Sequence, residues 1–280
     1  MKNLKKYYFL LVAIIMPIFY HCLNKFWYYL WFTLNLIDYL PNDLRTYLLT
    51  NHMSFDAIFC AILIAIVLPY YLWIKKVLKL TPKKYVKHFN VKSFLFCIVI
   101  SLGLAGITAI WQIFLRIFLM NIESVSTNVQ TFDNTFATST SFHAYLWSFL
   151  SIALLGPIIE ELIFRGILFT ELNRYFSSWV VVILTALYFG LWHSNPIQMV
   201  YTAILGLGLG LVYASTRNMW FPIIIHLINN MISTLPPSLE NNEMFMIIMI
   251  IVRFVAIIPM IFLLYKIIKN NKSILKWKIQ

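Results

Sequence analysis

Apolar stretches long enough to cross a lipid bilayer recur along almost the whole of this chain. A helix needs about 20 mostly apolar residues to span the hydrocarbon layer. We place the spans near residues 8–23, 54–74, 93–120, 143–165, 179–193, 197–214, 219–235 and 244–265. The aromatic segment from Phe26 to Tyr39 either extends the first span or lies at the membrane interface. The sequence therefore predicts an all-α polytopic membrane protein with about eight transmembrane helices.

The balance of apolar and charged residues excludes a soluble globular protein. Of the 280 residues, 61% are hydrophobic and only 11% are charged. A soluble surface needs more charged side chains than this, whereas lipid can face the excess apolar ones. The segment 121–142, rich in Ser, Thr and Asn, is the one long polar connection. We expect it to be a solvated external loop rather than a substrate-binding element.

The net charge of +12 lies mainly in three lysine clusters beside apolar stretches. One cluster opens the chain (2–6), and another closes it (266–278). The middle cluster consists of Lys75, Lys76, Lys79, Lys83, Lys84, Lys87 and Lys92. Basic residues gather on the cytoplasmic side of membrane proteins, so we expect a multi-pass protein of the cell membrane with both termini in the cytoplasm. No nucleic-acid recognition module accompanies the charge, so the expected partner is the bilayer and not nucleic acid.

Charges inside a membrane span are costly and therefore indicate function. Of the ten acidic residues, only Glu160 and Glu161 interrupt an apolar segment, and Arg165 follows them. Adjacent residues project about 100° apart on a helix, so one pocket does not easily use both carboxylates. Glu161 and Arg165 have the i,i+4 spacing and the order that favour an ion pair. Glu160 is left as the unpaired carboxylate, which makes it the candidate general base.

Two of the six histidines lie in apolar spans. His193 follows an apolar segment that Asn195 and Pro196 terminate, and His226 shares a helical face with Asn230. The other histidines are expected to be interfacial or solvated: His21, His52, His88 and His143. Either buried histidine alone is more typical of a hydrogen-bonded core residue. Polar groups in three consecutive spans favour a shared site instead.

These segments together resemble a known family. The motifs are Glu160-Glu161-Leu162-Ile163-Phe164-Arg165, Phe189-Gly190-Leu191-Trp192-His193 and His226-Leu227-Ile228-Asn229-Asn230. In this order, on apolar helices, they resemble those of the CAAX-protease and bacteriocin-processing (CPBP) family, which includes the type II CAAX prenyl endopeptidases. The resemblance covers roughly residues 150–235. It divides the chain into N-terminal helices (1–140), a catalytic core (141–240), and a last helix with a basic cytoplasmic tail (241–280).

The resemblance implies a role for each matching residue. Glu160 corresponds to the family's catalytic glutamate and His193 to its partner in activating water. His226 and Asn230 correspond to the pair that stabilises the oxyanion, and Glu161 and Arg165 to the supporting acid and base. The implied function is an intramembrane endopeptidase that cleaves membrane-associated peptides or proteins, such as bacteriocin or pheromone precursors, with a link to self-immunity. No residue reads a prenyl group.

Three alternatives stay open at this point. Glu160, His193 and His226 could instead bind Zn²⁺; we favour a metal-free site without any cofactor, because the His-Glu-x-x-His signature is absent and an amide beside His226 suits an oxyanion site. A non-catalytic scaffold or immunity protein of the same family is the second alternative. A transporter is the third, although the paired broken helices or repeats typical of transporters are missing from the sequence.

The predicted spans also raise a geometric difficulty. They place Glu160 near the cytoplasmic side and His193 near the opposite face of the membrane. The two side chains can meet only if helices tilt or start deeper, or if the Glu160 helix continues towards Asn173. Elsewhere, Gly206 and Gly210 indicate close helix packing. Arg253, in the middle of the last span, either pairs with a carboxylate or lines an aqueous cleft.

Overall fold

The computed structural model describes residues 2–77, 87–136 and 141–276, and every regular element within these ranges is a helix. The predicted all-α fold is thereby confirmed. Lys79, Lys83, Lys84 and Lys278, which belong to the predicted basic clusters, lie outside the described residues. Five helices within these described ranges are long and apolar enough to cross a membrane. They contain α1 (Lys2–Tyr28), α3 (Met53–Val77), α4 (Val91–Phe114), α10 (Pro196–Thr216) and α13 (Glu243–Asn270).

The three remaining predicted spans are helical as well. Two are the short apolar helices α9 (Ser178–Trp192) and α11 (Trp220–Ser233). The third is one continuous helix from Phe142 to Leu172, longer at its C-terminal end than the predicted 143–165. It consists of α6 (Phe142–Ser148), η5 (Phe149–Leu155), α7 (Gly156–Glu161), η6 (Leu162–Leu168) and α8 (Phe169–Leu172). Each predicted span therefore coincides with a helix.

Short elements complete the chain between these spans. The aromatic segment extends the first helix through a π-helical turn, η1 (Tyr29–Thr33), and one 3₁₀ turn, η2 (Leu36–Tyr39), follows. The α4 helix likewise continues into η4 (Leu115–Leu119). The short helices are α2 (Asn42–Thr50), α12 (Pro237–Glu240) and α14 (Lys272–Leu275).

The prediction of a solvated loop over 121–142 is wrong for α5 (Glu123–Phe136). Polar side chains in this helix bond back to its own carbonyls; the Thr127 hydroxyl, for example, donates to Glu123 O. On its apolar side, Val129 packs in a small buried cluster with Leu115. Asp133 forms an ion pair with the guanidinium of Arg116. The segment is polar in composition, but its few apolar residues fall on one helical face and anchor it.

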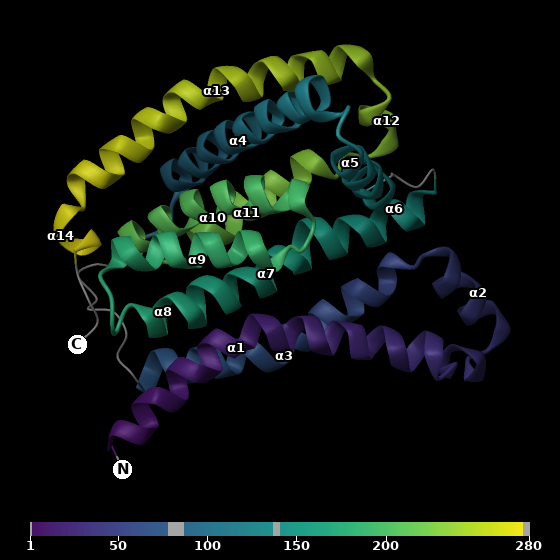
Figure 1. Cartoon of the computed structure of the whole chain (residues 1–280), viewed down its shortest axis with the longest axis horizontal. Helices are drawn as coiled ribbons and strands as arrows, with labels where there is room; N and C mark the ends of the chain where they lie inside the picture. The colour runs from purple at the N-terminus through teal and green to yellow at the C-terminus, as the bar shows by residue number, and fades with distance from the viewer. Residues whose placement is uncertain (1, 78–86, 137–140, 277–280) are drawn as a thin grey trace.

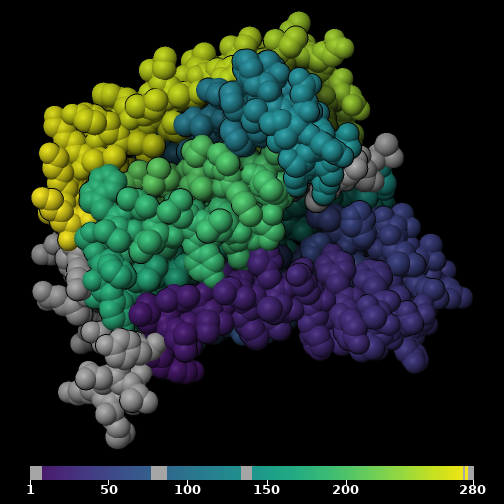
Figure 2. Space-filling model, viewed as in Figure 1, coloured from purple at the N-terminus to yellow at the C-terminus, as the bar shows by residue number. Residues whose placement is uncertain are grey.

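The helices form layers (Figure 1). The α4 and α13 helices pack together on one side of the molecule, and α1 and α3 cover the opposite side. The helix 142–172, α9, α10 and α11 lie between them. The space-filling view shows α1 packed against this central group (Figure 2). The predicted site residues all belong to the central layer, where other helices shield them: Glu160, Glu161, Arg165, His193, His226 and Asn230.

Close contact between α9 and α10 sets the geometry of the central layer. A side chain at Gly206 would lie 3.2 Å from Ala186 Cα, and one at Gly190 would lie 2.6 Å from Met199 O. Gly210 lies against Val182. The predicted close packing through Gly206 and Gly210 is therefore confirmed. Arg253 is half-buried on α13, and its backbone carbonyl lies against Gly106 of α4.

Candidate active site

The helix that carries Glu160 is widened on both sides of α7, where its backbone is π-helical. Gly156 N donates to Ser151 O, five residues back. A side chain at position 156 would meet that same carbonyl at 2.8 Å, so glycine fits here. The next residue, Pro157, has no N–H to donate. Such π-helical turns often occur at functional sites, because they re-aim neighbouring side chains.

The two adjacent carboxylates have different environments, as the helical geometry predicts. The Glu161 side chain is fully buried and forms an ion pair with Arg165, 2.7 Å between Oε1 and the guanidinium. The same Oε1 lies 3.0 Å from His226 Nδ1. The Glu160 side chain remains 14% exposed, and its Oε2 lies 3.7 Å from His226 Nε2. Glu160 is therefore the accessible carboxylate, and Glu161 serves as an internal partner for a cation and a histidine.

Arg165 connects the Glu160 helix to both of its neighbours. Its guanidinium donates to Glu161 and to Gly206 O, at 3.0 Å, in the interior of α10. It also lies over the ring of Phe189 in α9, 4.9 Å from the ring centroid. A buried guanidinium with an anion, a carbonyl and an aromatic face as partners avoids the cost of an unpaired buried charge. Arg165 therefore fixes the relative positions of three helices at the site.

His193 lies at the sharp turn between α9 and α10. Its backbone ends α9, and Ser194 adopts the left-handed conformation, with φ of 59°. Asn195 then caps α10, accepting hydrogen bonds from the N–H groups of Ile197 and Gln198. Proline in the first turn of α10 has no helical N–H to lose. The short turn leaves His193 half-buried.

The helix lengths remove the geometric difficulty that the predicted spans raised. The Glu160 helix runs on to Leu172, so Glu160 lies about 18 Å along its axis from that end, at 1.5 Å per residue. The α9 helix returns from the same end with only 15 residues, a length of about 22 Å. Glu160 and His193 therefore reach similar depths within the bundle. This match in depth requires both the long continuation of the Glu160 helix and the short length of α9.

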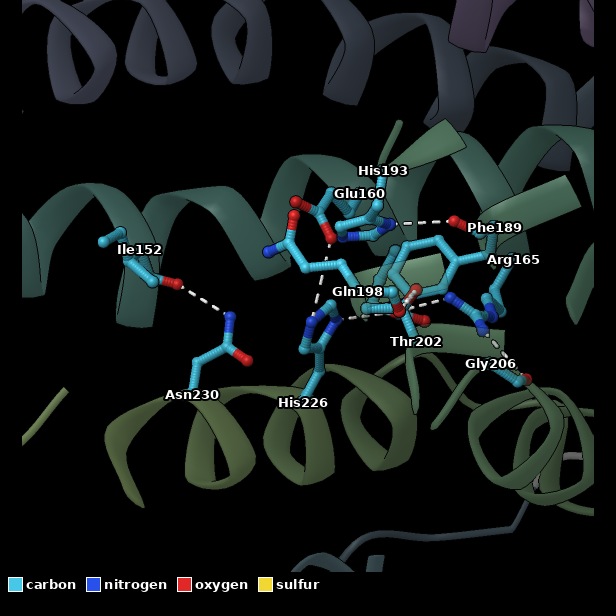
Figure 3. Close-up of polar contacts among 11 residues, drawn as sticks. Ile152, Glu160, Arg165, Phe189, His193, Gln198, Thr202, Gly206, His226 and Asn230 are labelled. Carbon is cyan, nitrogen blue, oxygen red and sulfur yellow. Dashed lines mark hydrogen bonds and ion pairs between the residues drawn. The ribbon is translucent and has the colours of Figure 1, made fainter. Parts of the chain in front are cut away.

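Hydrogen bonds at Nδ1 fix the orientation of both histidine rings, those of His193 and His226. His193 Nδ1 lies 2.8 Å from Phe189 O, and His226 Nδ1 lies 3.0 Å from Glu161 Oε1. A carbonyl can only accept, and a carboxylate paired with Arg165 does likewise, so both Nδ1 atoms donate. The rings of His193 and His226 pack against the same Phe189 ring, with centroid distances of 4.7 and 5.8 Å. Figure 3 shows His226 directed towards Glu160 from α11.

Asn230 has a different partner from the other predicted site residues. Its Nδ2 donates to Ile152 O at 2.9 Å (Figure 3). In a π-helical turn that carbonyl would accept from the residue five positions later, which is Pro157 and has no N–H. Asn230 therefore supplies the donor that the proline lacks. The structure brings Glu160, Glu161, Arg165 and His226 into direct contact, connects His193 to them through Phe189, and places Asn230 one turn further along α11.

Sequence reasoning did not identify two groups beside the site. Gln198, in the first turn of α10, points towards Glu160 in Figure 3. His21, expected to be interfacial or solvated, lies half-buried on α1, with Nε2 2.7 Å from Trp192 O. A glutamine next to a helix start is typical of an exposed position. A histidine in a span of otherwise unremarkable composition gives no sign of its distant partner.

Metal binding was the alternative use of the same side chains. Among the described residues, no three His, Cys, Asp or Glu side chains are grouped so that they could hold a metal ion.

Comparisons with known proteins cover the same central segment. Residues 141–232 match the family described as type II CAAX prenyl endopeptidase Rce1-like. The chain is 28% identical over 136 residues to "Putative membrane peptidase YdiL" of Bacillus subtilis (strain 168), which covers 46% of this chain and 55% of the relative. It is 29% identical over 85 residues to "Membrane-embedded CAAX protease MroQ" of Staphylococcus aureus (strain USA300), which covers 28% of this chain and 34% of the relative.

These matches confirm the predicted resemblance for the central segment. The chain spans between a third and about half of the length of these two relatives. No solved structure matches the chain.

Proposed function

We propose that this Rce1-like membrane protein is an intramembrane endopeptidase in which Glu160 activates a water molecule. The observation that carries the proposal is the unequal environment of the two carboxylates. Glu161 is fully buried and committed to Arg165 and His226, whereas Glu160 keeps an exposed fraction of 14% beside His226 Nε2. A carboxylate that is accessible, unpaired by any arginine and close to a histidine suits general-base catalysis.

In the proposed reaction, Glu160 carries out both proton transfers. Glu160 accepts a proton from water, with His193 Nε2 as a second acceptor that orients the same water. The water oxygen attacks the peptide carbonyl and forms a tetrahedral intermediate. Glu160 then donates its proton to the leaving amine as the C–N bond breaks. The acid and the base of the reaction are thus the same carboxyl group.

His226 is the proposed stabiliser of the oxyanion. Its Nδ1 is held by Glu161 and its Nε2 faces Glu160. With Nδ1 donating to Glu161, a second proton on Nε2 lets the ring donate to the developing oxyanion. Such a donor typically lowers the activation barrier by about 3–4 kcal/mol. Asn230 uses one amide hydrogen for Ile152 O, and its second hydrogen is the proposed additional donor.

The proposed substrates are peptides or proteins that reach the site through the membrane. The site lies in the central layer of an apolar helical bundle. A substrate therefore has to enter the site from the surrounding membrane. The names of the two relatives, a membrane peptidase and a membrane-embedded CAAX protease, favour peptide-bond hydrolysis at such a site. Processing of a bacteriocin or pheromone precursor, with both termini of the enzyme in the cytoplasm, is the specific form that we propose.

The test is cleavage of defined peptides by purified protein in detergent. The probes are synthetic peptides with one membrane-inserting segment and a polar tail, with and without an S-farnesyl cysteine near the carboxyl end. Wild-type protein is expected to cleave at least one probe, and Glu160→Gln is expected to abolish cleavage. The control is Glu123→Gln, an exposed acid on α5, which should retain wild-type activity. Full activity of Glu160→Gln would refute the assignment, and activity that a chelator removes and zinc restores would overturn the metal-free form.

A further inference from the structure

The N-terminal helix makes three hydrogen bonds to the end of α9, close to His193. The Tyr188 hydroxyl donates to Ile14 O at 2.8 Å, and Trp192 Nε1 donates to Pro17 O at 2.8 Å. In the opposite direction, His21 Nε2 lies 2.7 Å from Trp192 O. A carbonyl only accepts, so His21 Nε2 carries the proton and donates. These contacts join segments more than 170 residues apart in the chain.

The bond from His21 satisfies a group that α9 leaves open. The last carbonyls of a helix have no intrahelical N–H partner. At the end of α9, Phe189 O accepts from the His193 ring, and Gly190 O and Leu191 O accept from the next backbone N–H groups. Trp192 O, the carbonyl directly before His193, accepts from His21 at 2.7 Å and more distantly from the Ser194 hydroxyl at 3.4 Å. His21 therefore caps α9 from another helix.

Ring packing makes this cap rigid. The His21 and Trp192 rings lie 4.6 Å apart between centroids, and the Tyr20 and Trp192 rings lie 5.2 Å apart. Trp192 in turn packs against His193, at 5.1 Å, and against Phe189, at 6.2 Å. A displacement of the cap would therefore reach His193 through one peptide bond and through two aromatic contacts.

We propose that His21 is a positioning residue for His193, and that α1 is consequently part of the catalytic unit. This inference rests on the proposed function, in which His193 orients the attacking water. The α1 helix lies outside residues 141–232, the segment that matches the family. The His21 donor holds the carbonyl that precedes His193, and the turn through Ser194 keeps the imidazole directed at Glu160's water. Loss of the donor releases the turn without removing any group that touches the substrate.

Three substitutions separate the hydrogen bond from the ring packing. His21→Phe keeps a ring against Trp192 and removes the donor, whereas His21→Gln restores a donor at the same reach without the ring. Tyr188→Phe is the matched control, because it removes another α1–α9 hydrogen bond one turn away from His193. On a peptide probe that the wild type cleaves, His21→Phe is expected to lower kcat about 10- to 100-fold with KM within about twofold, since small misplacements of a catalytic group have effects of that order. His21→Gln should recover most of kcat, and Tyr188→Phe should leave it unchanged.

Amide hydrogen exchange tests the cap without any activity measurement. In His21→Phe, exchange in the segment 190–198 is expected to rise about three- to tenfold over the wild type, the effect of losing one hydrogen bond. Tyr188→Phe should not change that segment. Unchanged exchange and unchanged kcat in His21→Phe would overturn the inference, as would a His21→Gln protein as impaired as His21→Phe. Failure of the proposed function appears separately, as cleavage by Glu160→Gln, and leaves the exchange result to be judged by itself.

Discussion

Replacing Arg165 with methionine should destabilise the protein far more than removing an exposed ion pair. The Arg165 and Glu161 side chains are both fully buried and lie 2.7 Å apart. Removal of one partner from a buried pair leaves an uncompensated charge, at a cost of about 3–5 kcal/mol. Among the described residues, Glu161 would then keep only His226 as a partner within hydrogen-bond distance, 3.0 Å away. The carbonyl of Gly206 and the ring of Phe189 would also lose the guanidinium.

A double-mutant cycle isolates the interaction between the two charges. Arg165→Met and Glu161→Gln should each lower the free energy of unfolding by about 3–5 kcal/mol. The double variant, which has no buried charge left unpaired, should lose less than the sum, with a coupling energy of about 2 kcal/mol or more. The measurement is reversible unfolding in mixed micelles, followed by circular dichroism as the denaturing detergent is increased.

The chain offers an exposed ion pair as the control. The side chains of Arg116 and Asp133 are 45% and 47% exposed, and they lie 2.7 Å apart. Exposed pairs contribute about 0–1 kcal/mol, so Arg116→Gln and Asp133→Asn should have small effects and little coupling. An Arg165→Met effect no larger than that of Arg116→Gln, or a cycle without coupling, would refute the buried network as the element that fixes the site.

Other predictions concern the backbone around the site. Asn230→Ala should lower the free energy of unfolding by about 1–2 kcal/mol, because it leaves a part-buried carbonyl without a donor. Adding Pro157→Ala should recover part of this loss by supplying an N–H, which unfolding measurements on the double variant would show. Gly190→Ala should cost about 1–3 kcal/mol of stability and reduce peptide cleavage, because the added carbon meets a backbone carbonyl at 2.6 Å. Gly208→Ala, whose added carbon would lie nearest to the Leu104 side chain, at 3.0 Å, should cost less in the same assays. The reverse order would contradict the packing argument. Ser194→Gly should stabilise the fold by up to about 1 kcal/mol, since glycine adopts its φ of 59° without strain; a lower melting temperature for this variant would argue against that turn.

Much of the fold could be predicted because lipid imposes a simple length rule. Each predicted span coincides with a helix, and the helix-face argument predicts which carboxylate pairs with Arg165. The close packing at Gly206 and Gly210 also follows from their spacing alone. These features depend on local sequence, on helical periodicity and on the cost of burying charge, all of which the sequence displays directly.

The remaining features depend on contacts that local sequence does not contain. Hydropathy is insensitive to the extra residue of a π-helical turn, so the widened turns around Glu160 and the donor from Asn230 to Ile152 O were not predicted. Composition predicts a loop in place of α5, because its few apolar residues are outnumbered by polar ones. His21 lies near the end of a predicted span, and local sequence does not show that α9 ends beside it.

The most direct test of the central claim follows heavy oxygen through a single turnover. Wild-type protein in excess over a cleavable peptide, in water enriched in heavy oxygen, should produce a new carboxyl terminus that carries the label. The fragment containing Glu160 should stay unlabelled, because water attacks the substrate directly. Glu160→Gln should produce no labelled product. Label in the Glu160 carboxyl group, or an unlabelled product in the first turnover, would contradict the account, since either result requires a covalent intermediate on the enzyme.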